Sequence, residues 1–401
     1  MKVLQISTVC GSGSVGRITV DIYHTLKSCG DEGLIAYGRR QAPEGVEAFR
    51  FGSDLDMGFH VLSTFFRGEH GFASTGQTRK LIEKIREWDP DVIHLHNIHG
   101  FILQVEELFS YLKQAGKPVV WTLHDCWPYT GHCAFYDYTD QWKTGCKHCR
   151  EYRKTYPYAL FCNHTEQNYV RKKAAFTGVK NLTIVTPSQW LKGQVEQSFL
   201  KDYPVVVIPN GIDQSVFHPT DGTALRQKLG LEGKYVILGV ANVWERRKGL
   251  PAFLKLAEKL PASMQIILIG LSKKQLKNLP SNVMGLERTE SAQDLADYYS
   301  MADVFVNATL EDNFPTTNLE ALSCGTPVIT YETGGSPESL DEKCGRIVPK
   351  GDEAALEQAI REEAACPRTT EDCLQRAAYY KKQDRFMDYV KLYHRLTGQG
   401  E

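Results

Sequence analysis

Three acidic side chains stand close together in the segment TLEDNFPTTNLEALSCGTPVI, which covers residues 309–329. Glu311 and Asp312 are adjacent, and Glu320 follows Asp312 by eight residues. One interpretation is structural, because the helix dipole favours acids near the start of a helix. However, the Pro-Thr-Thr sequence at 315–317 predicts a helix start, where backbone N–H groups lack partners within the helix. Carboxylates beside free N–H groups can bind hydroxyls and phosphates together, a combination that suits a sugar nucleotide.

A second charged segment is WERRKG at residues 244–249. Three consecutive cations, Arg246, Arg247 and Lys248, most often lie on a solvated surface. Here they follow the apolar run YVILGVAN and precede a stretch with helical spacing. In that position the fork of an Arg and the point charge of a Lys can neutralise a pyrophosphate. We therefore favour a phosphate-binding role for this segment.

Two further segments follow apolar runs in the first half of the chain. In CGSGSVGR at residues 10–17, glycines allow a tight turn and the next helix offers N–H groups to an anion, to which Arg17 can add a contact. The alternative is a plain strand-to-helix turn. The run PVVWTLHD ends in His124 and Asp125. A single His is more often structural, but its place at a strand end favours contact with a ligand.

Short runs rich in Val and Ile predict the strands that position these segments. The runs are KVLQIST, DVIHLHN, PVVWTLHD, LTIVTPS, VVVIPNG, YVILGVAN, QIILIG, ADVFVNAT, TPVITYE and GRIVP. Stretches with helical spacing, such as RKLIEKIREW and LPAFLKLAEKL, lie between most of them. Strands that alternate with helices indicate parallel sheets covered on both faces. Ligands bind beyond the carboxyl ends of such strands, which is where all four segments lie.

The number of strands exceeds what one sheet comfortably holds, and the length of 401 residues favours two domains. Turn-forming residues gather in NGIDQSVFHP at 210–219, between the two sets of strands. We predict an α/β protein of two Rossmann-like domains, with an N-terminal domain at 1–208 and a C-terminal domain at 209–375. Apolar and aromatic residues at helical spacing over 370–396 predict a terminal helix, which we assign to a segment at 376–401.

The composition is that of an ordinary globular protein, with 42% hydrophobic and 24% charged residues. A net charge of −1 gives no global field that would recruit nucleic acid, so no nucleic-acid partner is expected. The N-terminus MKVLQIST lacks the apolar core of a signal peptide, and no apolar run is long enough to span a bilayer. Eleven cysteines, an odd number, then indicate a reducing cytoplasm.

Several of these motifs together resemble the retaining glycosyltransferases of family 4, which have the GT-B fold. The hallmark of that family is an acidic pair spaced E-x7-E, followed by A-L/M-A-x-G-x-P-V-I. Here Asp312 and Glu320 take the two acidic positions, and ALSCGTPVI follows. The resemblance extends over HLHN, the His124-Asp125 pair, TPSQWL, PNGID and RKG, and so spans nearly the whole chain. The chain departs from the family in having Asp at 312 in place of Glu, and Asn242 near the place of a family Arg.

The resemblance implies a deep cleft between the domains and a last helix that crosses back to the first domain. It places the donor mainly on the C-terminal domain, with the diphosphate on Arg247 and Lys248 and the ribose on Glu320. It assigns catalytic roles to His124, Asp312, Arg247 and Lys248. The residues that it implies for donor binding are Gly11, Gly13, Gly16, Arg17, Asn242, Asn313, Phe314, Pro315, Thr316, Thr317 and Glu320.

The function implied is retaining transfer of a sugar from a UDP- or GDP-sugar to a hydroxyl of a saccharide or a lipid-linked saccharide. The resemblance further implies a role in exopolysaccharide, capsule or lipopolysaccharide synthesis. Cations and helix amides replace a metal at the donor site, so no cofactor is expected there. A cytoplasmic enzyme with peripheral contact at the inner membrane face would fit a lipid-linked acceptor.

Five cysteines lie between Cys126 and Cys162, and this segment resembles the insertion that a subgroup of the family carries after the His-Asp pair. Cys133, Cys146 and Cys149 match the cysteines of the subgroup, whereas its cysteine near 139–140 is absent. Three thiolates with a fourth ligand could hold a structural zinc, the candidates being Cys162, His132 and His148. Reduced thiols in an ordered loop are the alternative.

Two other classes of function compete with the transferase. An NAD-dependent oxidoreductase would need G-x-G-x-x-G and an acid about 20 residues further on, and the loop at 10–17 lacks that pattern. A non-catalytic protein that binds a sugar nucleotide would retain the binding residues, and only the Asp at position 312 points to it.

Overall fold

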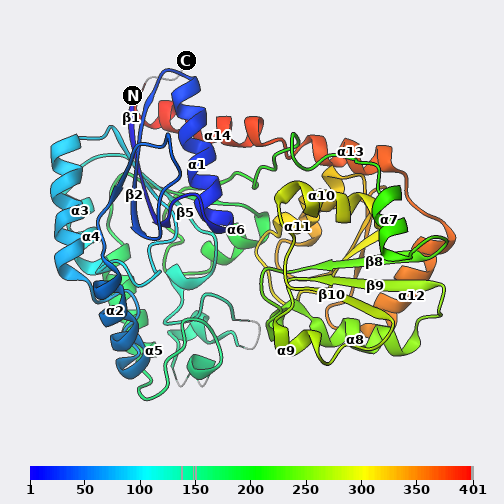
Figure 1. The fold of residues 1–401 in the computed structure, drawn as a ribbon. Helices are drawn as coiled ribbons and strands as arrows, with labels where there is room; N and C mark the ends of the chain where they lie inside the picture. Colours follow the sequence, from blue (N-terminus) through cyan, green and yellow to red (C-terminus); the bar gives the residue numbers. More distant parts are fainter. Residues whose placement is uncertain (137–138, 148, 150, 399–401) are drawn as a thin grey trace. The chain divides into compact units, whose positions relative to one another are not determined.

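The computed structural model describes residues 1–136, 139–147, 149 and 151–398. The chain forms two compact units, drawn in Figure 1. Unit 1 consists of Met1–Pro209 together with the tail that begins at Gln383, and unit 2 consists of Asn210–Lys382. The chain therefore leaves unit 1 one residue later than the predicted boundary at 208, and returns at 383 where we expected 376.

Unit 1 is built on a sheet of seven parallel strands in the order β3-β2-β1-β4-β5-β6-β7. The strands are β1 (Lys2–Val9), β2 (Glu32–Arg39), β3 (Ala48–Arg50), β4 (Val92–Leu95), β5 (Val119–Thr122), β6 (Leu182–Thr186) and β7 (Val205–Val207). The helices are α1 (Gly13–Ser28), α2 (Asp54–Arg67), α3 (Thr75–Trp88), α4 (Val105–Ala115), α5 (Thr165–Phe176), α6 (Gln189–Val195) and α14 (Lys382–Leu396). Short 3-10 helices cover Trp127–Tyr129, Gln141–Thr144 and Glu151–Arg153.

Helices cover both faces of the unit 1 sheet, as its buried and apolar strands require. Apolar residues of α3, α4 and α5 form one core cluster with the strands. On the other face α1 shares a cluster with the tail helix α14, which contributes the buried Phe386, Tyr389 and Tyr393. The Tyr393 hydroxyl also bonds His94 Nδ1 on β4 at 2.6 Å. The last helix therefore completes the core of the first unit.

Unit 2 carries a six-stranded parallel sheet in the order β10-β9-β8-β11-β12-β13. The strands are β8 (Tyr235–Val240), β9 (Met264–Ile269), β10 (Val283–Leu286), β11 (Val304–Asn307), β12 (Val328–Tyr331) and β13 (Gly345–Val348). The helices are α7 (Thr223–Leu229), α8 (Leu250–Lys259), α9 (Lys273–Leu276), α10 (Ala292–Met301), α11 (Thr316–Ser323), α12 (Glu353–Ala365) and α13 (Thr370–Ala378). Short 3-10 helices cover Arg246–Lys248 and Pro337–Ser339. One face packs on α8 and α12 and the other on α10, α11 and α13.

All ten apolar runs that predicted strands form strands, but the sequence analysis missed β2, β3 and β10. Two glycines interrupt the apolar run of β2, EGLIAYGR, so that its sequence did not indicate a strand. The packing of neighbouring side chains explains why glycine occupies both positions. A Cβ at Gly33 would lie 2.8 Å from the Tyr23 ring of α1, and one at Gly38 would lie 2.3 Å from Ile102. Both glycines therefore allow neighbouring side chains to approach the sheet closely.

The predicted helix over 370–396 is in fact two helices, α13 and α14. Between them the backbone of residues 380–382 pairs with Ile212, whose N–H donates to the Tyr380 carbonyl at 2.8 Å. The Lys382 N–H in turn donates to the Ile212 carbonyl at 3.0 Å. These bonds replace helical ones, so residues up to 382 stay with unit 2. Among the described residues, no helix combines the length and apolar character needed to cross a bilayer.

Candidate active site

The charged segments after β8 and β11 meet at one edge of the unit 2 sheet. The two strands are neighbours, with Val304 beside Ile237 and Phe305 beside Leu238. Their carboxyl ends therefore bring the 3-10 helix Arg246–Lys248 next to the Glu311-Asp312 pair. Two hydrogen bonds to one backbone carbonyl join these loops, since the Leu310 N–H and the Thr309 hydroxyl both donate to the Arg247 carbonyl, at 2.6 and 3.1 Å. The sheet topology thus assembles the predicted phosphate and sugar segments.

An ion pair between Lys248 and Asp312 lies at the centre of this edge. Arg247 Nη1 is 3.8 Å from Asp312 Oδ2 and donates to the Glu311 carbonyl at 3.1 Å. Burial alone would raise the pKa of the Asp312 carboxyl, but Lys248 and Arg247 outweigh it and hold that pKa below its usual range. Asp312 is therefore a carboxylate at neutral pH, and it orients both cations.

Two glycines let these loops approach each other. Gly249, which follows Lys248, has a φ of +78°, and a Cβ there would lie 2.0 Å from the Ala308 carbonyl oxygen. Gly334 follows β12 with a φ of +53°, and its Cβ would lie 1.7 Å from the Asp312 carbonyl oxygen. Any side chain at either position would force the loops apart.

Helix α11 starts beside the ion pair and carries the second acid. Its N-cap residue is Pro315, whose side chain caps none of the first-turn amides. Thr316 and Thr317 are partly exposed in that first turn. Glu320 is buried and accepts a hydrogen bond from the Tyr299 hydroxyl at 2.9 Å. The start of α11 therefore offers N–H groups to an anion, with a carboxylate one turn further on.

A buried amide network fixes α11 to the sheet. Asn307, the last residue of β11, donates from Nδ2 to Asn318 Oδ1 at 2.8 Å, and Asn318 Nδ2 donates to Ser339 Oγ at 2.9 Å. Phe314 points its ring into the core against Tyr380, which leaves only its backbone for a ligand. Asn313 is buried as well, whereas Asn242 is exposed in the loop after β8. No described contact joins Asn242 to the Lys248–Asp312 pair.

The predicted glycine loop of unit 1 is the turn between β1 and α1. Gly11 and Gly13 have φ values of +74° and +68°, and the Gly11 N–H donates to the Gly16 carbonyl at 2.9 Å. The N-cap residue Ser12 makes no side-chain cap, and Arg17 is exposed in the first turns of α1. The loop therefore has the conformation of a strand-to-helix turn with an uncapped helix start.

Hydrogen bonds determine which nitrogen of His124 carries a proton. Gln5 Nε2 donates to the Thr19 carbonyl at 3.0 Å, so Gln5 Oε1 accepts from His96 Nε2 at 3.0 Å. His96 Nδ1 must then accept, and its contact of 3.2 Å with His124 puts the proton on His124 Nε2. Burial lowers the pKa of His124 to about 4, so the ring is neutral near pH 7. His124 Nδ1 is thus a hydrogen-bond acceptor, suited to a hydroxyl.

Asp125 has a different role from its neighbour His124. Its Oδ2 lies 2.8 Å from His99 Nε2, and its Oδ1 accepts from the Trp127 N–H at 3.0 Å. Burial alone would raise the pKa of Asp125, but His99 and the Trp127 amide outweigh it and lower that pKa. Asp125 therefore holds the start of the cysteine-containing insertion in place.

Cys133, Cys146 and Cys149 of the insertion lie close to one another. The thiols of Cys133 and Cys149 are hydrogen-bonded to each other, and the Gly131 N–H donates to Cys146 Sγ at 3.0 Å. Burial raises the pKa of Cys146 to about 11, which favours the neutral thiol. Cys162 is partly exposed. In the part of the chain that the structure describes, no three His, Cys, Asp or Glu side chains are arranged to hold a metal. His148, a candidate fourth ligand, lies outside the described residues.

Comparison with known proteins identifies the family. A family model described as Glycosyltransferase Family 4 matches residues 16–216, just over half of the chain. The chain belongs to glycosyltransferase family 4. A second model, described as Glycosyl transferases group 1, matches residues 234–364 of this glycosyltransferase, within unit 2.

Relatives and solved structures of the glycosyltransferase agree with this assignment. WcaC of Escherichia coli K12, named as a glycosyl transferase of colanic acid biosynthesis, is 28% identical over 322 residues, 77% of each chain. Alpha-galactosylglucosyldiacylglycerol synthase of Streptococcus pneumoniae is 26% identical over 50% of this chain and 56% of the synthase. Sucrose-phosphate synthase of Thermosynechococcus elongatus covers 99% of both chains, with a TM-score of 0.73 and 18% identity. Anabaena HepE in complex with UDP has a TM-score of 0.67 and 15% identity over 98% and 99% of the two chains. These structures confirm the predicted GT-B class.

The sequence analysis missed several residues that position the site in this glycosyltransferase. Gly334 belongs to the segment TGGS, which one residue separates from the end of β12. It is a glycine-rich strand end like the one at 10–17, and that signal could have revealed it. Tyr299 on α10 and Ser339 carry no such signal, because they reach Glu320 and Asn318 only through the tertiary fold.

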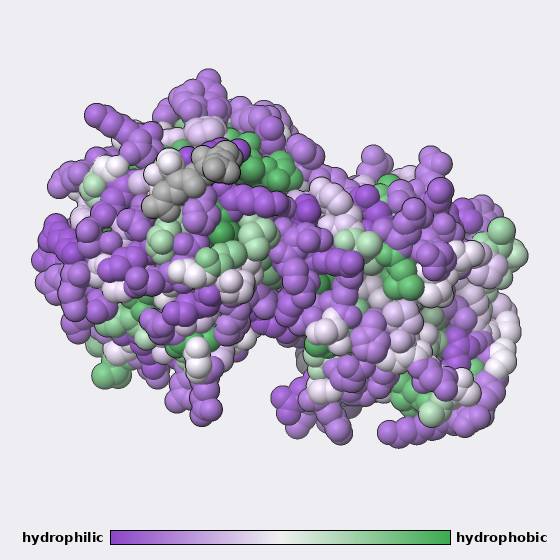
Figure 2. All heavy atoms as spheres, turned by 90° about the horizontal axis from the view of Figure 1, so that it is seen from above, coloured by the Kyte–Doolittle hydropathy of each residue, from purple (hydrophilic) through white to green (hydrophobic). Residues whose placement is uncertain are grey.

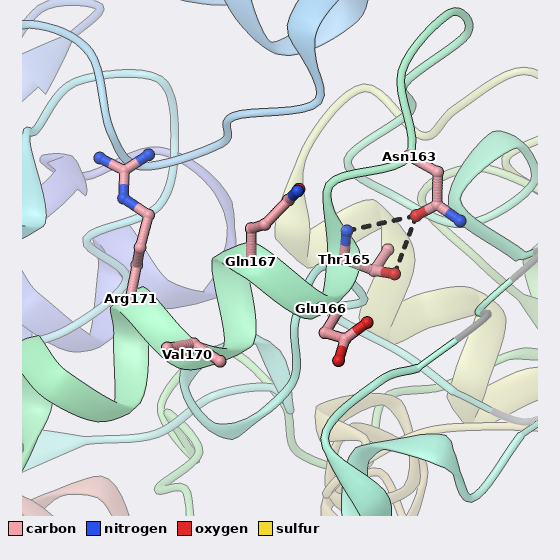
Figure 3. A pocket seen from close by; sticks show the side chains of 6 residues that line it. All are labelled: Asn163, Thr165, Glu166, Gln167, Val170 and Arg171. Atoms are coloured by element: carbon pink, nitrogen blue, oxygen red, sulfur yellow. Dashed lines mark hydrogen bonds between the residues drawn. The ribbon is translucent and has the colours of Figure 1, made fainter.

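The glycosyltransferase also has a hollow of about 640 Å³ at the start of α5, beside the cysteine-containing insertion, since Asn163 and Thr165 bond the carbonyls of Cys149 and Cys146. Asn163, Thr165, Glu166, Gln167, Val170 and Arg171 line it. In Figure 3, Arg171 and Gln167 point to one side of α5 and Glu166 to the other. We do not assign the donor to it, because the cations and the uncapped amides of unit 2 lie elsewhere.

Proposed function

We propose that this glycosyltransferase moves a sugar from a UDP- or GDP-sugar to a hydroxyl of a saccharide or a lipid-linked saccharide, with retention of configuration. The observation that carries the proposal is the Arg247–Lys248–Asp312 cluster beside the uncapped start of α11. The name of WcaC supports a role in the synthesis of a surface polysaccharide, and the UDP in HepE supports a uridine donor. Within the family we favour the subgroup with the cysteine-containing insertion.

Each part of the site has one role in this proposal. Arg247, Lys248 and the backbone N–H groups of Phe314, Thr316 and Thr317 bind the diphosphate, since a fork, a point charge and a helix start all favour an anion. Glu320 binds the ribose hydroxyls, and Asp312 keeps Lys248 in position and contacts the transferred sugar. His124 accepts a hydrogen bond from a sugar hydroxyl through Nδ1. For the glycine loop at 10–17 we propose a contact with the phosphates of the donor.

The proposed chemistry takes place on one face of the sugar. The bond from the anomeric carbon to the diphosphate oxygen breaks, and the acceptor oxygen forms its bond to that carbon on the same face. The proton of the acceptor hydroxyl passes to the leaving diphosphate. A retaining glycosidase would instead use a free carboxylate nucleophile about 5 Å from an acid. The contacts of Asp312 with Lys248 and of Glu320 with Tyr299 favour binding roles for both acids.

A thermal-shift panel of UDP, GDP and their sugars tests the donor assignment. A nucleotide at a hundred times its Kd adds about 2.7 kcal/mol, enough to raise the Tm of a domain of the size of unit 2 by about 5–11 °C. We expect such a shift for uridine or guanosine diphosphates and none for ATP at the same concentration. Mass spectrometry of the products then identifies the sugar and the acceptor. A panel in which no nucleoside diphosphate raises the Tm would refute the proposal.

Metal removal tests the chemistry of the donor site. We expect turnover to be unchanged in EDTA, because Arg247, Lys248 and helix amides carry the charge of the diphosphate. A loss of turnover that Mg²⁺ or Mn²⁺ restores would show that a cation belongs to the donor site. Metal analysis of the purified protein tests the structural zinc separately, and a zinc content near zero would leave the cysteines as reduced thiols.

A further inference from the structure

Helix α2 of unit 1 has its apolar side turned to solvent. A surface helix normally buries its apolar stripe, yet the only buried residues of α2 are the polar His60 and Thr64. Leu55, Phe59, Leu62 and Phe66 are between 50% and 78% exposed. Their spacing of four, three and four residues places them on one side of the helix.

A second segment extends this apolar surface. The Leu160 N–H donates to the Phe65 carbonyl at 3.0 Å, which fastens the loop after residue 157 to the end of α2. The Phe161 ring, 62% exposed, stacks on Phe66 with centroids 5.2 Å apart. We call Leu55, Phe59, Leu62, Phe66 and Phe161 the α2 apolar face. By contrast, hydrophilic side chains predominate on the side of the molecule drawn in Figure 2.

Polar contacts on the inner side of α2 hold this orientation. His60 Nδ1 lies 2.8 Å from Ser74 Oγ, and His60 Nε2 accepts from the Gly71 N–H at 3.2 Å. Asn168 on α5 donates to the Gly68 carbonyl at 2.6 Å. A roll that buried the apolar side would break the His60 bonds inside unit 1, so the exposure of this side is fixed by the fold.

Basic residues gather at the end of α2 that carries the aromatic rings. Arg67, next to Phe66, is 69% exposed and lies 3.4 Å from the carboxylate of the less exposed Glu69. Arg153 and Lys154 are exposed in the segment that precedes the loop at Leu160. The Ala159 N–H donates to the Tyr152 carbonyl at 3.1 Å, which joins that segment to the loop. Residues 140–173 contain eight Lys and Arg against three Asp and Glu, of which Lys172 is buried and Arg171 pairs with Glu106. The acids of α2, Asp54 and Asp56, occupy the opposite end.

We propose that the α2 apolar face docks into the interface of a lipid bilayer that contains anionic lipid. This deepens and rests on the proposed function, because a lipid-linked acceptor must be met at a bilayer. Aromatic and aliphatic side chains on one side of a fixed helix, flanked by cations, match the requirements for binding at such an interface. A second copy of the chain fits less well, because a two-fold contact would place this basic segment against its own copy.

Flotation of the full chain with vesicles tests the proposal. We expect the protein to float with vesicles of phosphatidylcholine and phosphatidylglycerol, and to bind about tenfold less to phosphatidylcholine alone or at high salt. Phe59→Ser combined with Phe66→Ser should lower binding at least about tenfold. The matched control is Ile347→Ser combined with Tyr379→Ser, because these side chains are 49% and 51% exposed in unit 2. That control should float like the unaltered protein.

The readouts separate this inference from the proposed function. The nucleotide-induced Tm shift, measured in solution without vesicles, should be the same in both double variants. Equal flotation of the Phe59/Phe66 variant and the control would overturn the docking surface, and equal binding to neutral vesicles would overturn its preference for anionic lipid. Self-association that the Phe59/Phe66 variant abolishes would assign the face to a contact between copies instead. Vesicle binding without any nucleotide shift would reject the proposed function alone.

Discussion

Lys248→Ala is expected to lower kcat/KM by about 10²–10³-fold, which corresponds to about 3–4 kcal/mol of lost transition-state stabilisation. Lys248 is one of the two cations assigned to the leaving diphosphate, and Asp312 holds it in position. The variant removes that charge where negative charge develops as the donor bond breaks. The measurement is the steady-state rate of sugar transfer with the donor that the thermal-shift panel identifies.

A matched control separates catalysis from stability. Lys382 pairs with Asp213 in unit 2, and its side chain is 27% exposed compared with 22% for Lys248. Lys382→Ala should reduce stability without changing kcat/KM. In Lys248→Ala, Asp312 keeps Arg247 as its one cationic neighbour of the pair. When Asp312→Asn is added, this acid is removed as well, so the double variant should be more stable than Lys248→Ala but no more active. Near-normal turnover in Lys248→Ala would contradict the role assigned to this residue.

Unit 1 is expected to lose stability steeply between pH 7 and pH 5. Burial lowers the pKa of His60 and His124 to about 4 and that of His132 to about 3. The pKa values of His70, His94 and His96 also lie well below the ordinary value, with burial again the main cause. In the unfolded chain each His takes up a proton near pH 6.5. Below that pH the unfolded state binds more protons than the folded state, so the free energy of unfolding falls as the pH is lowered. At pH 5 each such His costs about 2 kcal/mol, and the first three together cost roughly 6 kcal/mol.

Replacing one of these histidines should flatten that dependence. His70 is buried against the rings of His60, Phe101 and Trp127, and neither of its nitrogens has a hydrogen-bond partner among the described residues. His70→Phe keeps the ring contacts and removes the titration, so it should lose less stability between pH 7 and pH 5 than the unaltered protein. His24→Asn, at an exposed position on α1, is the control that should change nothing. Denaturant unfolding at several values between pH 7 and pH 5 measures the free energy of unfolding. If it depended on pH equally in His70→Phe and His24→Asn, the prediction would be refuted.

The meeting of the two charged segments in the candidate site could be predicted from the sequence because parallel sheets collect their strand ends at one edge. The runs before Arg247 and before Glu311 become β8 and β11, and these neighbouring strands bring both charged segments together. Phe314 and Asn242 were both predicted to bind the donor through their positions in the motifs. In the structure Phe314 turns its ring into the core, and Asn242 is exposed without a described contact to the ion pair. Neither outcome could be predicted from a motif, because packing decides where a side chain points.

The sequence by itself determined the alternation of strands and helices, the family, and the types of side chain available for a diphosphate and a sugar. Only the tertiary structure decided their pairings. It joined Lys248 to Asp312, fixed the proton of His124 through His96 and Gln5, and returned α14 to unit 1 through Tyr393 and His94. It also turned the apolar side of α2 outward. Periodicity and motifs report local preference, whereas these contacts join residues as far apart as 299 positions in the chain and exist only once both sheets have formed.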